Sequence, residues 1–247
     1  PGLRAARDGD LLALRRLVAA GAWDPGSRDR NGCPALLWAA GGGHLGVCRY
    51  LVDECGIDPR TTAERSKRGF AGRTSLHWAA RNGRLSVLRW LLSEQRVDVD
   101  SATEDGTTAF HWATWQGHLD CMQLLHQQGC DVHSRNRYSC NAALWSSQGL
   151  GGVEVCEYLL GLGLDFGLIN ANGHSVVHKA AQRGRAGVCR WLLEGVAARR
   201  LGLSAAHVGR DDDNHSPSQL AELEGHAELA AWLLPREASL LARGKKK

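Results

Sequence analysis

Three histidines, His77, His111 and His178, follow a Thr or Ser by three residues and stand in closely similar sequence contexts. A recurring histidine could act as a general acid or base, but that chemistry also needs a substrate group or nucleophile within hydrogen-bond reach. The pattern places no acid or nucleophile beside them, and Leu37 and Leu144 fill the corresponding position elsewhere. We therefore expect a structural role for these histidines, and likewise for His44, His118 and His226, and no enzymatic activity.

Cysteines offer a second set of reactive groups, since the chain has eight. Cys48, Cys156 and Cys189 each precede a hydrophobic pair by three residues, at a position that Leu88 and Met122 fill in other segments. A position that accepts Leu, Met or Cys is an apolar packing site, so we expect reduced thiols in a core rather than disulfides.

Metal and phosphate chemistry also lack support in the sequence. The pairs His118/Cys121 and Cys130/His133 are isolated half-sites, and there is no CxxC motif. The acidic run 211–213 has no further ligand spacing and is predicted to be a solvated loop. No Gly-rich phosphate loop stands out. We expect no metal, no cofactor and no small-molecule substrate.

These side chains belong to a repeating frame marked by seven glycines. Each glycine is followed eight positions later by a leucine, and the intervals between glycines are 34, 40, 34, 34, 33 and 41 residues: Gly9, Gly43, Gly83, Gly117, Gly151, Gly184 and Gly225. A period of this size is typical of stacked helical repeats, each unable to bury its apolar face alone. We expect each glycine to form a left-handed turn between two helices.

The repeat frame resembles that of ankyrin repeats, as the segments GRTSLHWAARNG at 72–83 and GTTAFHWATWQGH at 106–118 illustrate. The resemblance implies an all-α ankyrin solenoid whose motif histidines hydrogen-bond the turn between neighbouring units. It covers a single domain at 1–238 with about seven units, the first and last being caps: 3–28, 29–59, 70–102, 103–135, 136–169, 170–200 and 211–235. The fifth unit departs most, with Ser139 in the opening glycine position and a first helix expected to be displaced. Residues 239–247 are expected to form a basic tail that is frayed from Arg243 onward.

Positions that the repeat leaves variable are candidates for partner contact. Trp115 is the most distinctive, since an indole at the variable end of a first helix is a natural anchor. The ankyrin resemblance implies that such positions face a concave surface or form hairpin tips. The candidates are Arg81, Asn82, Trp115, Gln116, Gln182 and Arg183 on the inner helices, and Arg30, Arg73, Glu104, Thr107, Arg137, Tyr138, Asn172 and His174 near the tips. The other tryptophans form two columns that we interpret as packing between repeats.

Arginine accounts for 25 of the 30 basic residues. Arg15, Arg49, Arg89 and Arg190 share one position of the second helix and should form an outward stripe. The long connection at 59–71 adds Arg65, Lys67 and Arg68 as a candidate basic contact. The other long connection, 195–210, is also predicted to be a loop. Guanidinium groups suit carboxylate or phosphate oxygens, so an acidic protein segment or an RNA backbone could meet these residues.

The sequence therefore predicts a protein-protein interaction module. Two alternatives stay open: a structural subunit of a ribonucleoprotein assembly whose arginines contact RNA, and the targeting arm of an enzyme whose catalytic domain lies outside these residues. No apolar run reaches the roughly 20 residues needed to span a bilayer, so no membrane association is expected. The chain begins with proline, which suggests a domain excised from a longer protein or a removed N-terminal stretch. An intracellular location, cytoplasmic or nuclear, is expected, with organellar import left open.

Overall fold

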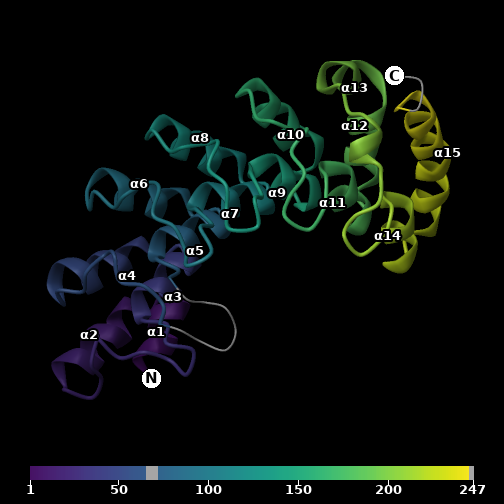
Figure 1. Cartoon of the computed structure of the whole chain (residues 1–247). Coiled ribbons are helices and arrows are strands. Elements are labelled where there is room, and N and C mark those ends of the chain that lie inside the picture. The colour runs from purple at the N-terminus through teal and green to yellow at the C-terminus, as the bar shows by residue number, and fades with distance from the viewer. Residues whose placement is uncertain (65–71, 245–247) are drawn as a thin grey trace. The chain divides into compact units, whose positions relative to one another are not determined.

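The computed structural model describes residues 1–64 and 72–244, and within them it contains fifteen α-helices (Figure 1). The helices form two compact units, residues 1–131 and 132–247. The first contains α1 (Gly2–Asp8), α2 (Leu11–Ala19), α3 (Ala35–Gly42), α4 (Leu45–Arg49) with the π-helical turn η1 (Tyr50–Glu54), α5 (Ser75–Arg81), α6 (Leu85–Ser93), α7 (Ala109–Gln116) and α8 (Leu119–Gln127). The second contains α9 (Ala142–Gln148), α10 (Gly152–Gly161), α11 (Val176–Gln182), α12 (Ala186–Leu193), α13 (Gly195–Leu201), the 3₁₀ turn η2 (Ala205–His207), α14 (Pro217–Leu223) and α15 (Ala227–Gly244).

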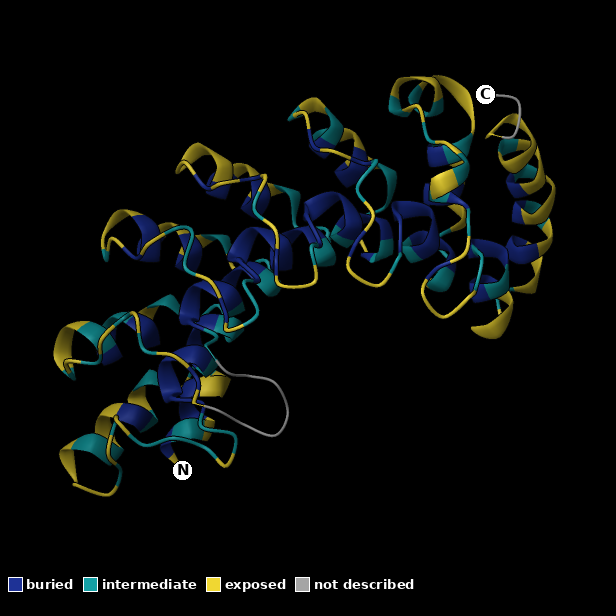
Figure 2. Cartoon of the chain, viewed as in Figure 1, coloured by how far each residue is buried: buried dark blue, intermediate teal, exposed yellow. Residues whose placement is uncertain are grey.

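The first helices of successive repeats stack directly on one another within each unit. In the first unit α1 packs on α3, α3 on α5 and α5 on α7, and in the second α11 packs on both α9 and α14. Their facing positions are alanines that are fully buried, among them Ala39, Ala40, Ala79 and Ala80, and these helices are the darkest part of Figure 2. Small side chains allow the close approach, as the sequence predicted. The predicted all-α repeat architecture is confirmed.

The second helix of each repeat is amphipathic and covers one side of this stack. In α6, Val87, Leu88 and Leu91 are fully buried while Arg89 is exposed. The position shared by Cys48, Leu88, Met122, Cys156 and Cys189 is fully buried in every case. The prediction that this is an apolar packing site is therefore confirmed.

The turn between the two helices of a repeat has the expected left-handed glycine at six of the seven marked positions: Gly9, Gly43, Gly83, Gly117, Gly184 and Gly225. Gly151 is the exception. It has a φ of −76° and precedes α10, whereas the next residue, Gly152, has a φ of 62°. The extra residue in this repeat thus moves the left-handed position by one, so the expectation for Gly151 was wrong.

Four of the hairpin tips are closed by a side chain that accepts backbone N–H groups. Asp29 Oδ1 accepts from the amides of Asn31 and Cys33 at 2.7 and 2.9 Å, and Asn136, Asn170 and Asp211 make the same pair of bonds in later repeats. Such side-chain acceptors replace backbone partners in tight turns. Asp211 is consequently buried, which corrects the expectation that the run 211–213 is simply solvated.

The two long connections have different outcomes. The second, at 195–210, is not a loop throughout, because it contains α13 and η2, and η2 packs against α11 and α15. Residues 65–71 of the first, with the predicted contacts Arg65, Lys67 and Arg68, lie outside the described residues.

The C-terminal helix is longer than the sequence indicated. Helix α15 continues to Gly244, so most of the tail predicted at 239–247 is helical. Glu237 fixes it in place: this buried carboxylate accepts from the backbone N–H and the hydroxyl of Ser218 at 2.6 and 2.7 Å. It thereby caps the N-terminus of α14, where the helix dipole favours negative charge. None of the helices in the described part of the chain combines the length and the hydropathy that crossing a membrane requires.

Candidate functional site

The motif histidines sit inside capping boxes at the start of the first helices. His77 Nδ1 accepts from the Thr74 amide at 3.1 Å, so the ring proton is on Nε2, which donates to the Thr107 carbonyl of the next repeat at 3.2 Å. His178 makes the equivalent bonds to Ser175 N and Gly209 O. The predicted bond to the neighbouring turn is thus confirmed for both.

The same geometry removes these rings from acid–base chemistry near neutral pH. Burial lowers the pKa of His77 and of His178 to about 4, which keeps both rings neutral at pH 7. Both nitrogens of each ring are already engaged by backbone groups. His44 and His118 also bond a carbonyl of the preceding repeat, Arg7 O at 2.9 Å and Arg81 O at 3.1 Å.

Burial also makes three of the cysteines unsuited to reaction. Burial raises the pKa of Cys48 and Cys189 to about 12 and of Cys156 to about 11, so none forms the thiolate that nucleophilic or metal chemistry requires. All eight are free thiols. Within residues 1–64 and 72–244, no three His, Cys, Asp or Glu side chains are grouped to hold a metal ion.

A different group of side chains stands out on the first unit, which we call the Arg–Trp cluster: Arg73, Trp78, Arg81, Trp112 and Trp115. The Arg81 guanidinium carbon lies 5.4 Å from the ring centre of Trp78 and 5.3 Å from that of Trp112. Arg73 covers the same two rings, at 5.9 and 4.6 Å. Trp115 extends the cluster, with its ring centre 5.4 Å from that of Trp112. Two guanidinium groups are therefore held against the faces of two indoles, a favourable cation–π geometry.

The surroundings of Arg81 favour an incoming negative charge. Burial, together with the like charge of Arg81, lowers the pKa of Arg73. The Arg81 Nε–H is buried and has no hydrogen-bond partner among the described residues, and no ion pair joins Arg81 to a described carboxylate. A buried donor left without a partner is costly. Helix α5 delivers Arg81 at its last turn, and α7 brings both Trp112 and Trp115.

Other predicted residues on the inner helices have different surroundings. Asn82 Nδ2 donates to Gly41 O at 3.1 Å and so serves the contact between α3 and α5. Gln116 is half-exposed beside Trp115, while Gln182 is half-exposed and Arg183 exposed on the second unit. The structure brings Arg81, Trp115 and Gln116 onto two adjoining helices, and it adds Arg73, which was predicted as a tip residue.

The predicted tip residues divide by exposure. Exposed side chains are Arg30, Glu104, Arg137, Tyr138 and Asn172. Two others are buried, contrary to the expectation of surface positions: Thr107, and His174, whose Nε2 donates to Asp211 Oδ2 at 2.9 Å. Thr107 lies in a tip closed by its own bonds, with its amide donating to Thr103 Oγ1 at 3.1 Å, whereas His174 is buried because it pairs with Asp211 of the adjacent tip.

Part of the outward arginine stripe takes part in contacts between repeats. Arg15 lies over the Tyr50 ring of the following repeat at 5.0 Å, and Arg49 lies over Trp90 at 5.9 Å. Each is also paired with a carboxylate, Arg15 with Glu54 and Arg49 with Glu94, the latter at 2.6 Å. Sequence reasoning found both the arginine and the aromatic columns but not their pairing, which the one-position offset between the columns could have indicated.

Comparison with protein families gives one consistent result. A family model described as ankyrin repeats (3 copies) matches residues 3–103, 63–136 and 142–243. The crystal structure of the human ASB11 ankyrin repeat domain is similar with a TM-score of 0.70 at 23% identity, covering 96% of this chain and 97% of that one. This likeness supports the fold.

Two curated relatives match most of this chain but are themselves considerably longer. Mouse protein fem-1 homolog A-like is 30% identical over 244 residues, which is 95% of this chain and 35% of that protein. Human ankyrin repeat domain-containing protein 63 is 30% identical over 218 residues, 87% of this chain and 56% of that protein. The chain thus spans about a third to about half the length of these relatives.

Proposed function

Because the chain belongs to the ankyrin-repeat family, whose repeats are generally protein-interaction modules, we propose that it binds another protein with the Arg–Trp cluster at the centre of the contact. The observation that carries this proposal is the position of Arg81. Its guanidinium lies between two indoles, and its Nε–H is buried without a partner among the described residues. Trp and Arg are also the residues that most often dominate binding energy at interfaces.

The cluster suits an acidic side chain of the partner. The Arg81 guanidinium, which has no carboxylate partner among the described residues, gains from a carboxylate placed beside it. The surrounding indoles exclude water, so the attraction is stronger than at an open surface. Gln116 and the exposed tip residue Glu104 supply polar groups for the rim of the interface, while Trp115 supplies apolar area.

The RNA alternative gains less support from the described residues. Two outward arginines, Arg15 and Arg49, are already paired with carboxylates and stacked on rings, so their charge is largely used within the chain. An RNA contact would therefore depend on other arginines, and it would weaken steeply with salt. We therefore favour a protein partner.

The test compares two pairs of variants in capture experiments followed by affinity measurement. We expect Arg81→Ala with Trp115→Ala to weaken partner binding by about 2 kcal/mol or more, roughly 30-fold, with the fold intact. The matched pair Arg49→Ala with Arg89→Ala removes two arginines of the outer stripe and should change binding far less. A protein captured by wild type and by the outer pair, but lost with the inner pair, is the expected partner.

The same comparison of the two variant pairs defines the result that would refute the proposal. Binding that survives the inner substitutions and is lost with the outer ones would refute the proposal and favour the outer arginines. If that binding also fell steeply as salt was raised, the partner would be RNA.

A further inference from the structure

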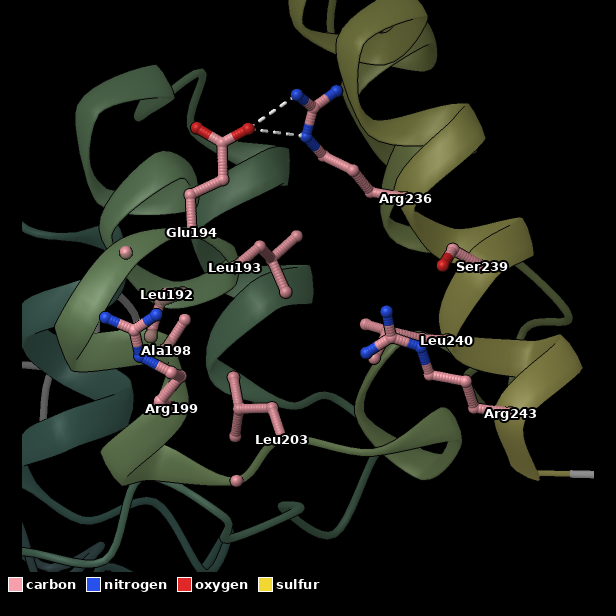
Figure 3. A pocket seen from close by; sticks show the side chains of 12 residues that line it. Leu192, Leu193, Glu194, Ala198, Arg199, Leu203, Arg236, Ser239, Leu240 and Arg243 are labelled. Carbon is pink, nitrogen blue, oxygen red and sulfur yellow. Dashed lines mark hydrogen bonds and ion pairs between the residues drawn. The ribbon is translucent and has the colours of Figure 1, made fainter.

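The second unit contains a cleft that the interaction just proposed does not use. It lies between α12 and α13 on one side and α15 on the other, with a volume of about 600 Å³ (Figure 3). This volume is within the range of sites that bind small molecules or peptide side chains. It arises where the chain departs from the regular repeat, because α13 belongs to the long connection and α15 extends past the last repeat.

Contacts at one end of the cleft join its two walls. Arg236 of α15 pairs with Glu194 at the end of α12, with its Nε and a guanidinium Nη 3.0 and 2.5 Å from the same carboxylate oxygen. Glu237 ties α15 to the start of α14. Meanwhile α13 has no buried residue. Among the described residues, no side chain fills the space between α13 and the end of α15.

The lining combines an apolar interior with a basic rim. Leu192 is buried at the base, and Leu193, Leu203 and Leu240 turn toward the space in Figure 3. Arg199 of α13 and Arg243 of α15 stand on opposite walls and are exposed. Among the described residues neither has an ion pair or a hydrogen bond to another side chain, whereas Glu194 is neutralised by Arg236. The cleft therefore carries two uncompensated positive charges over a leucine surface.

We propose that this cleft binds a peptide segment of a partner protein that carries leucine-like side chains next to carboxylates. The leucines of the cleft would take the aliphatic side chains, since burying apolar surface is favourable. The two guanidinium groups would pair with the carboxylates, a geometry that suits arginine.

A polypeptide fits better than a small acidic lipid because the cleft is open. Arg199 and Arg243 are exposed at its rim, so the cleft does not enclose an occupant as small-molecule sites do.

The test uses three fluorescein-labelled peptides and measures anisotropy at low ionic strength. The peptide GSLLEELG is the probe, GSLLQQLG removes only its charge, and GSSSEESG removes only its leucines. We expect the probe to bind at least about tenfold more tightly than either matched peptide. Equal binding of the probe and either matched peptide, or no binding of the probe, would overturn the proposal.

Protein variants locate the probe. Arg199→Gln with Arg243→Gln should weaken binding at least about tenfold, and Ala198→Phe should block the cleft sterically without changing charge. Arg135→Gln, an exposed arginine elsewhere on the second unit, is the control and should bind normally. Loss of binding in Arg81→Gln alone would assign the probe to the Arg–Trp cluster and refute the cleft. Displacement of the probe by dodecanoate, with tighter binding of dodecanoate itself, would make the occupant a lipid acid and also overturn the proposal.

Discussion

Replacing His77 by glutamine tests the idea that the motif histidines work as neutral caps. The chain already contains this replacement, because Gln219 fills the same place in α14, where its Oε1 accepts from the Ser216 amide at 3.0 Å. Glutamine at 77 should therefore keep the capping bond to Thr74 while removing a titrating group. It gives up the bond from the ring to Thr107 O, at a cost of about 1 kcal/mol at neutral pH.

The magnitude follows from the lowered pKa. His77 has a pKa of about 4 in the folded chain against an ordinary value of 6.5. Between these two pH values the unfolded chain therefore binds a proton at His77 that the folded chain does not bind. The stability from neutral burial is complete above pH 6.5 and is lost as the pH falls towards 4. Between about pH 7.5 and pH 5 the loss from this one residue is about 2 kcal/mol. Arg73 and Asp105 face the same ring with opposite effects on its pKa, and the pKa of Asp105 is itself lowered below 3.8, outside this interval.

Urea unfolding followed by tryptophan fluorescence measures the effect at each pH. We expect wild type to be more stable than His77→Gln at pH 7.5 and less stable at pH 5, so that the two stability curves cross. His133→Gln, at an exposed histidine, should follow the wild-type curve. Parallel curves for wild type and His77→Gln over this range would refute the argument that burial of a neutral ring gives this pH dependence.

Three further predictions concern the repeat frame. Gly117→Val, at a φ of 79°, and Ala79→Leu, at a fully buried contact, should each lower the free energy of unfolding by about 2 to 4 kcal/mol through strain or overpacking; unchanged urea midpoints would contradict the assigned frame. Ser139→Gly should raise stability by about 1 kcal/mol because Ser139 has a φ of 57°, which favours glycine, and the matched change Gly106→Ala, at a φ of 80°, should lower it. Cys48, Cys156 and Cys189, with raised pKa values, should resist iodoacetamide in the native chain and react in urea, as alkylation followed by mass spectrometry would measure; rapid native alkylation would show that they are not core residues.

The sequence was sufficient for features that depend on one repeat alone. Local requirements of helix packing or backbone conformation explain the small residue Ala79, the apolar position shared by Leu88 and Cys48, and the turn residue Gly83. Such requirements recur in every unit, so the period itself displays them. The same logic correctly assigned His77 and His178 to structural bonds.

Features that depend on departures from the repeat were harder to predict. Nothing in the spacing indicated that the connection at 195–210 would form α13, because a short helix without buried residues leaves no periodic apolar signal. His174 and Asp211 lie 37 residues apart and pair only because two hairpin tips are adjacent. The single extra residue before α10 moved the left-handed glycine from 151 to 152. Because both residues are glycines, the residue types alone could not show which of them is left-handed.

Arginine illustrates how a structure can separate residues that look alike in sequence. Arg49 and Arg81 both lie against indole rings, and both are candidates for binding. Arg49 also has the carboxylate of Glu94 at 2.6 Å, so its charge is satisfied within the chain and a partner would have to displace an existing ion pair. Arg81 has the same aromatic support without a described carboxylate, and a partner's acid would remove the cost of its unpartnered Nε–H rather than compete with Glu94. Arg199 and Arg243, beside the apolar cleft, likewise have no carboxylate partner among the described residues. The missing acid, rather than the exposure of the arginine, is therefore what points to a contact with another molecule.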